Sequence, residues 1–219
     1  MEFRVFNLAQ VDFKKSWQFQ KKIFKEVKNN YLQAALILCR HNPVITVGRL
    51  GKKENIKVST HELKNKGIDI YEIERGGDVT YHGPGQLIAY PIFNLHHLKK
   101  DIHFFLRQLE ETIIDFLLDF GIRGVRYKGL TGVWIGKQKI SSIGIAVKNW
   151  ISFHGVSINI KKDDLNNFYL IKPCGMDIQM TSMESILDRN VEIDDIKDRL
   201  IQKFRNNFQY SVNASLLIS

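Results

Sequence analysis

The chain has 219 residues and a formal net charge of +9; 44% of its residues are hydrophobic and 25% are charged. These proportions are typical of a soluble globular enzyme, and the length is sufficient for one domain with a substantial core. No segment reaches the ~20 apolar residues that cross a bilayer, and the N-terminus lacks the apolar run of a signal peptide. We therefore expect one cytoplasmic domain over residues 1–219, monomeric and without a membrane partner.

The positive charge favours acidic partners, such as nucleic acid or an acidic protein. The basic residues, however, occur as scattered pairs such as Lys14-Lys15 and Lys161-Lys162 rather than as one stripe. A nucleic-acid-binding protein would show clustered Arg and Lys with interleaved aromatic residues or a recognisable motif, and neither is present in this sequence. Net charge alone therefore does not identify a partner.

The hydrophobic pattern predicts three helices and several strands that do not alternate regularly. Helices are expected over residues 14–30, from the N-cap Asp101 to Gly121, and over residues 193–208. Strands are expected over residues 34–39, 44–47, 68–73, 87–92, 133–135, 140–147 and 151–160. Since the elements do not form βαβ units, we predict an α+β fold with a mixed or antiparallel sheet and helices packed against it.

The two cysteines lie in different sequence contexts. Cys39 ends an apolar run that is predicted to be a buried strand, and a free cysteine there is expected to be inert. Cys174 lies between Pro173 and Gly175, in a turn-forming context where backbone geometry can hold a nucleophile within reach of a substrate. A cytosolic setting keeps both thiols reduced.

Residues 75–86, RGGDVTYHGPGQ, hold four glycines and a proline. Glycines at this density are needed where the backbone approaches a ligand closely or takes a positive φ. Apolar runs flank the segment, so we expect a strand, a rigid loop and a second strand. An ordinary turn takes about two to five residues, and the extra length favours a binding loop.

Three further segments follow this one: KISSIG at residues 139–144, His154-Gly155, and Pro173-Cys174-Gly175. Together, in this order, the four segments resemble the octanoyltransferase family of lipoate biosynthesis, the lipoyl(octanoyl)-acyl-carrier-protein:protein N-octanoyltransferases. The resemblance covers about residues 36–185, most of the chain. It implies the fold of the catalytic domains of biotin and lipoate protein ligases.

The resemblance implies a catalytic dyad of Cys174 as nucleophile and Lys139 as general acid/base. A lysine at the start of a strand is usually solvated, so the sequence context of Lys139 alone does not indicate this role. An ammonium group beside a thiol favours the thiolate, and partial desolvation lets the lysine take and return a proton. An activated thiol can accept an acyl group from one donor and pass it to another.

The resemblance also implies an acyl pocket. Its expected residues are Arg75, Gly76, Gly77, Asp78, Val79, Thr80, Tyr81, His82, Ser142, Ile143, Gly144, His154, Gly155, Val156 and Ser157. Three roles stay open: His82 either orients the substrate or the dyad or is a structural histidine, and His154 either lies in the pocket wall or is structural. Arg75 either contacts the phosphopantetheine of the carrier or braces the loop.

The implied partners are octanoyl-acyl carrier protein as donor, and as acceptors the lipoyl domains of 2-oxoacid dehydrogenase complexes and the glycine cleavage H protein. No cofactor is expected, because the acyl group arrives on the phosphopantetheine of the carrier. No metal site is expected either, since His96, His97 and His103 have no zinc-like spacing to a cysteine or carboxylate. The alternative enzyme is an ATP-dependent lipoate or biotin protein ligase, which would need no thiol.

Overall fold

The computed structural model describes residues 3–173 and 176–208; Cys174 and Gly175 lie outside the described residues. Its strands are β1 Arg4–Val11, β2 Ala34–His41, β3 Val44–Val47, β4 Asp69–Glu72, β5 Val79–His82, β6 Gln86–Phe93, β7 Val125–Tyr127, β8 Leu130–Ile135, β9 Gln138–Lys148 and β10 Ile151–Asn159. Its α-helices are α1 Phe13–Lys28, α2 Thr60–Asn65, α3 Ile102–Leu118, α4 Met183–Leu187 and α5 Ile193–Asn207. Short 3₁₀ helices are η1 Lys53–Asn55, η2 Leu95–His97 and η3 Asp163–Leu170.

The larger sheet has the strand order β1-β2-β6-β10-β9-β8-β7. Its pairs are antiparallel except for β1 and β2, which run parallel, so the predicted α+β fold with a mixed sheet is confirmed. Strand β1 was not predicted from the sequence. That strand is at the edge of the sheet and is half-exposed, so its sequence, RVFNLAQV, lacks the apolar run that marks a buried strand.

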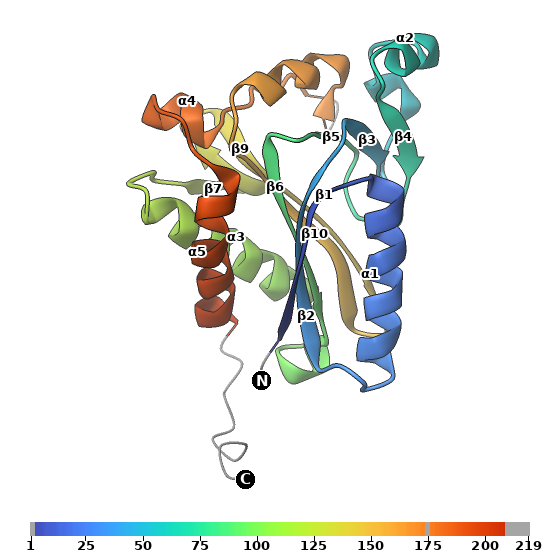
Figure 1. Cartoon of the computed structure of the whole chain (residues 1–219), viewed down its shortest axis with the longest axis vertical. Coiled ribbons are helices and arrows are strands. Elements are labelled where there is room, and N and C mark those ends of the chain that lie inside the picture. Colours follow the sequence, from blue (N-terminus) through green and yellow to red (C-terminus); the bar gives the residue numbers. More distant parts are fainter. Residues whose placement is uncertain (1–2, 174–175, 209–219) are drawn as a thin grey trace.

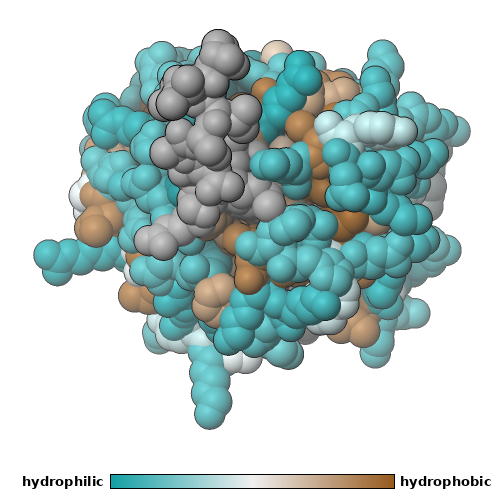
Figure 2. All heavy atoms as spheres, turned by 90° about the horizontal axis from the view of Figure 1, so that it is seen from below, coloured by the Kyte–Doolittle hydropathy of each residue, from teal (hydrophilic) through white to brown (hydrophobic). Residues whose placement is uncertain are grey.

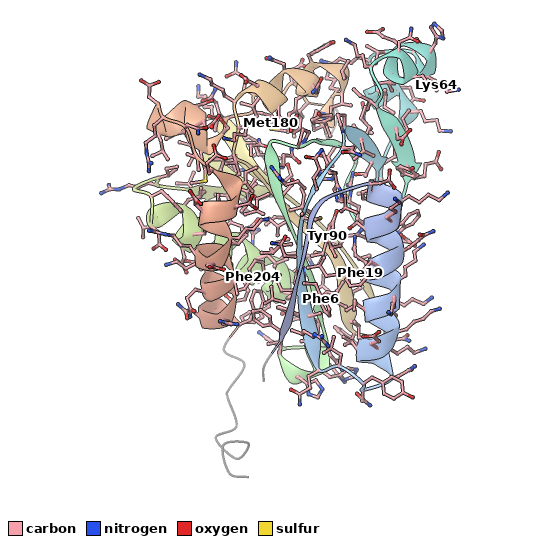
Figure 3. All side chains as sticks on the ribbon, in the orientation of Figure 1. Phe6, Phe19, Lys64, Tyr90, Met180 and Phe204 are labelled. Carbon is pink, nitrogen blue, oxygen red and sulfur yellow. The ribbon has the colours of Figure 1, made fainter. Side chains whose placement is uncertain are left out.

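Helices cover both faces of this sheet (Figure 1). On one face, residues of α1 such as Ile23 and Val27 pack against β2 and β6. On the other face, α3 and α5 supply the apolar stripe that contains Phe116 and Phe204. Figure 3 shows Tyr90 between the sheet and α1, with Phe204 on the opposite side. The three predicted helices are confirmed, and Asp101 caps α3 by accepting from Phe104 N at 3.0 Å.

A second, three-stranded sheet has the order β4-β3-β5. The prediction of one continuous loop over residues 75–86 was wrong, because Val79–His82 forms strand β5 and pairs with β3. Valine, threonine and tyrosine favour strands, and the ladder with β3 satisfies their backbone groups. The glycine-rich segment is therefore a short loop at residues 75–78, a strand, and a tight turn at residues 83–85.

The end of the molecule seen from below in Figure 1 is covered mostly by hydrophilic side chains, with hydrophobic ones visible between them (Figure 2). Within the described ranges 3–173 and 176–208, no helix has both the length and the apolar character to cross a membrane. The segments singled out in the sequence come together at a cavity that is lined by residues of the larger sheet and of the loop at residues 75–78.

Candidate active site

A cavity of about 560 Å³ lies between the larger sheet and the loop at residues 75–78. This volume is within the ~300–1,000 Å³ range of small-molecule sites. Of the predicted pocket residues, all except Tyr81 line the cavity, and so does Lys139. Pro173 and Met176, the described neighbours of Cys174 and Gly175, line it as well.

Lys139 is held near the start of β9 by backbone contacts with a later segment. Its N–H donates to Gln179 O at 2.8 Å, and its carbonyl accepts from Thr181 N at 3.0 Å. The residue is 8% exposed, and its ammonium lies 5.3 Å from the centre of the Trp134 ring. Lys139 is therefore buried beside an aromatic ring, whereas its position at the start of a strand suggests a solvated side chain.

Gly132 provides the space in which the Lys139 side chain lies. A Cβ at Gly132 would come within 2.5 Å of Lys139 Cε, and φ at Gly132 is +128°. The Gly132 N–H donates at 3.0 Å to Glu110, whose side chain is 1% exposed and pairs with Arg107 and Arg126. A buried carboxylate on α3 thus fixes the backbone that supports the lysine.

Arg75 braces the loop. Its guanidinium donates to Thr46 Oγ1 at 3.2 and 3.0 Å, to Thr46 O at 2.6 Å and to Gly76 O at 3.0 Å. The Gly76 N–H donates to Ile145 O at 2.8 Å, so the loop is fastened both to β3 and to β9. A Cβ at Gly76 would meet only Ile145 O, at 3.6 Å, so the absent side chain leaves open space at the cavity.

Asp78 ties the loop to the preceding segment, residues 48–55. Its carboxylate accepts from Lys52 N at 3.1 Å and from the Asn55 side chain. Leu50 N donates to Gly77 O at 3.1 Å, and Leu50, which is 75% exposed, contributes to the cavity lining. The segment at residues 48–55 therefore forms part of the cavity mouth.

His82 belongs to a buried hydrogen-bond chain. Its Nδ1 donates to Gln86 Oε1 at 3.0 Å, and the Gln86 amide donates to Asn159 Oδ1 at 3.0 Å. Asn159 donates in turn to the carbonyl of Thr181 at 3.0 Å, the residue whose N–H bonds Lys139. Burial lowers the pKa of His82 to about 3, so the ring is neutral. His82 thus links the glycine-rich segment to the backbone that holds the lysine.

His154 lies in the cavity wall with a backbone φ of +57°. A left-handed residue inside a strand interrupts the alternation of side chains between the two faces of the sheet. Here, all the consecutive residues from His154 to Ser157 line the cavity. Burial lowers the pKa of His154, and its neutral ring donates from Nε2 to Glu74 Oε2 at 3.3 Å. That hydrogen bond lowers the pKa of Glu74 to about 2.

Tyr81 points away from the cavity and into the contact between β5 and η3. Its hydroxyl donates to Asp164 Oδ1 at 3.0 Å, and Asp164 Oδ2 accepts from Gly85 N at 3.1 Å. A Cβ at Gly83 would lie 2.3 Å from Asp164 Oδ2, and one at Gly85 would lie 2.7 Å from Asp164 Cβ. These two glycines therefore make room for a carboxylate of the fold rather than for a ligand, contrary to the expectation for the segment.

Cys39 is buried, as predicted. Burial raises the pKa of its thiol to about 12, so it does not supply a thiolate at neutral pH. Its Sγ lies 3.6 Å from His41 Nε2 and 4.0 Å from Ser16 Oγ. Of the two cysteines, only Cys174 is left as a candidate nucleophile, and it lies outside the described residues.

Comparison with known proteins identifies the family of this chain. The family described as "Lipoyl protein ligase A/B catalytic domain" matches residues 12–205. A protein named octanoyltransferase from Thermoanaerobacter pseudethanolicus is 44% identical over 215 residues, covering 97% of this chain and 93% of the relative. A protein of the same name from Clostridium kluyveri is 41% identical and covers 94% of this chain and 87% of the relative.

The chain belongs to the octanoyltransferase family. Solved structures with the same fold are more distant in sequence. A lipoate-protein ligase A bound with ATP has a TM-score of 0.75 at 19% identity, covering 95% of this chain and 86% of that one. A biotin protein ligase from Aquifex aeolicus has a TM-score of 0.59 at 13% identity, covering 94% and 70%. At these identities the likeness shows the fold alone.

Several cavity residues of this octanoyltransferase-family chain were not predicted from the sequence. Phe13, Ile88, Tyr90 and Trp134 line the cavity, yet each belongs to an apolar pattern that reads as ordinary core. Alternation along β6 places Ile88 and Tyr90 on one face. No local signal distinguishes a core face that encloses a cavity from one that is fully packed.

Proposed function

We propose that this enzyme transfers an octanoyl group from octanoyl-acyl carrier protein to a specific lysine of lipoyl domains, through a thioester on Cys174. Octanoyl transfer is supported by full-length similarity to proteins named octanoyltransferase. The observation that carries the covalent route is the buried Lys139 in a cavity that Pro173 and Met176 also line. The segment between these two residues contains Cys174.

In the first half-reaction, Lys139 takes the thiol proton, and the Cys174 thiolate attacks the carbonyl carbon of the octanoyl thioester. A new carbon–sulfur bond forms, the bond to the phosphopantetheine sulfur breaks, and the leaving thiolate receives the proton from Lys139. In the second, the acceptor lysine, which has released one proton to solvent, attacks the Cys174 thioester as a neutral amine, and neutral Lys139 takes a second proton from the attacking nitrogen. An amide forms, and the enzyme thiol is restored with the proton that Lys139 holds.

The cavity suits the acyl part of this substrate. Its walls include Ile88, Ile143 and Val156, and the histidines His82 and His154 are kept neutral by burial. A hydrocarbon chain is stabilised by apolar contact and is not stabilised by buried charge.

The proposed acceptors are the lipoyl domains of 2-oxoacid dehydrogenase complexes and the glycine cleavage H protein, and the setting is the cytoplasm, where thiols stay reduced. The donor arrives already activated as a thioester, so the reaction consumes no ATP and the enzyme uses no cofactor of its own. A ligase with the same fold would first activate a free acid with ATP.

The test is transfer in the absence of ATP. Purified enzyme is mixed with octanoyl-carrier and an unmodified lipoyl domain, and the mass of the lipoyl domain is followed. The proposal predicts a gain of one octanoyl group without nucleotide, and no gain with Cys174→Ala. A requirement for free octanoate and ATP would favour the ligase instead.

A further inference from the structure

Three strands of the larger sheet place a row of residues beneath the cavity. In the strand registers, Ser157 of β10 lies opposite Ser142 of β9 on one side and opposite Ile88 of β6 on the other. All three residues line the cavity. Because neighbouring strands lie ~4.8 Å apart, the row crosses about 10 Å of the sheet from β9 to β6. Lys139 is also on β9, three residues before Ser142, so its backbone lies about 10 Å along the strand from the β9 end of the row.

Large buried side chains close the β6 end of this row. Ile88, Tyr90 and Phe13 are 1%, 4% and 2% exposed, and all three line the cavity. Figure 3 shows Tyr90 near the middle of the molecule, separated from Met180, the residue that forms a β-bridge with Lys139. The cavity therefore has its lysine at β9 and an apolar wall at β6.

Behind this wall, the Tyr90 hydroxyl and the His41 ring are hydrogen-bonded to each other and carry no charge. Tyr90 Oη donates to His41 Nε2 at 2.8 Å, and His41 Nδ1 donates to Val11 O at 3.0 Å. Burial lowers the pKa of His41 to about 4, so its ring is neutral at neutral pH. The Phe13 ring packs edge-on against His41, with the ring centres 5.3 Å apart. The wall thus presents carbon to the cavity.

We propose that Ile88, Tyr90 and Phe13 form the end of the acyl-binding cavity and limit the accepted chain to the octanoyl length. This inference rests on the proposed function, because it takes the acyl carbonyl of the thioester to lie at the β9 end of the row, over Ser142. A chain that runs from Ser142 across β10 reaches Ile88 of β6 after about 10 Å, which is close to the extended length of an octanoyl chain. A longer chain meets Ile88.

The test compares acyl chain lengths on one carrier protein. The rate of Cys174 acylation is measured by intact mass for hexanoyl, octanoyl, decanoyl and dodecanoyl carriers. Ile88→Ala removes three carbons from the wall, and one or two added methylenes in an apolar pocket change specificity by about 10–200-fold. We expect the decanoyl-to-octanoyl rate ratio to rise at least about tenfold in Ile88→Ala. Ile88→Phe should shift the preference the other way, towards hexanoyl.

Ile92→Ala is the matched control, since Ile92 lies on the same strand and in the same apolar cluster but not among the residues that line the cavity. It should lower the thermal midpoint as Ile88→Ala does and keep the wild-type profile. If Ile88→Ala does not fold, Ile88→Val should show a smaller shift in the same direction. Folded Ile88 variants with a wild-type profile would overturn the inference. Absence of any acyl adduct on the wild-type Cys174 would instead contradict the proposed function.

Discussion

Gly132 is the position at which a single methyl group should displace Lys139, the proposed general acid/base. The added Cβ of Gly132→Ala would lie 2.5 Å from Lys139 Cε and 2.5 Å from Ser141 O. The Lys139 side chain must move away from the new methyl group, and the contact with the Ser141 carbonyl must also displace the backbone of the paired strand β9. Residual overlap costs about 1–3 kcal/mol, and a non-glycine residue at a φ of +128° adds roughly 1–3 kcal/mol of backbone strain. We expect the free energy of unfolding to fall by about 2–6 kcal/mol.

The effect on catalysis should exceed the effect of strain alone. Misplacing a reacting group by ~1 Å costs about 10²-fold in rate, so acylation of Cys174 by octanoyl-carrier should slow by that order. The assay is single-turnover acylation followed by intact mass, with urea unfolding of the same samples. Gly136→Ala is the control, because Gly136 has a φ of +53° and nothing lies within 4 Å of its added Cβ. If folded Gly132→Ala is acylated as fast as Gly136→Ala, the proposed dependence of the lysine on Gly132 is wrong.

Three further predictions concern the lysine, the buried histidines and the carrier. Lys139→Met should slow acylation and discharge by about 10²–10⁴, and Lys139→Arg should restore little, because arginine does not release its proton; a near-wild-type Lys139→Arg would show that the base lies elsewhere. Stability should fall as the pH drops from about 6.5 towards 4, since His41 and His82 have folded-state pKa values of about 4 and 3 while the unfolded chain binds protons at higher pH. Each histidine contributes up to ~1.4 kcal/mol per pH unit to the slope of the free energy of unfolding against pH. Urea unfolding of His82→Gln between pH 4 and 7 should therefore show a shallower slope than the wild type. An equal slope would contradict the neutral state of His82. If the charge of +9 guides an acidic carrier, the second-order rate constant with octanoyl-carrier should fall steeply from 0.1 to 1 M salt, because the Debye length shrinks from ~10 to ~3 Å. The rate with a small octanoyl thioester should hardly depend on salt. Equal salt sensitivity of the two substrates would rule out electrostatic steering.

The parts of the fold that the sequence predicts are those with strong local signals. The continuous apolar run of β2 and the capped apolar stripe of α3 can each be recognised from the residues of that element alone. By contrast, β1 and β5 pair with strands that are distant in the sequence, and neither has an apolar run long enough to mark it as a strand. The glycines of the turn at residues 83–85 likewise depend on a residue distant in the sequence. The space that their side chains would fill is occupied by Asp164, 79 positions after Gly85.

The candidate site was predicted in part for a similar reason. The resemblance identified the segments around Lys139, and the structure brings most of them to one cavity. Glu110 could not be recognised, because a glutamate on an amphipathic helix is normally solvated, whereas here it is buried against Arg126 and the Gly132 N–H. Phe13 lines the cavity because α1 begins next to the cavity. This position depends on tertiary packing and cannot be read from the sequence around Phe13.

The proposed route passes the octanoyl group through Cys174. It is tested by the intact mass of the enzyme after mixing with octanoyl-carrier alone, without ATP or acceptor, followed by peptide mapping. We expect one octanoyl adduct on Cys174 that hydroxylamine removes and that a lipoyl domain discharges. Cys39→Ala should keep the adduct, because burial raises the pKa of the Cys39 thiol to about 12 and makes it inert. An adduct on Cys39, or none unless ATP and free octanoate are supplied, would contradict the account.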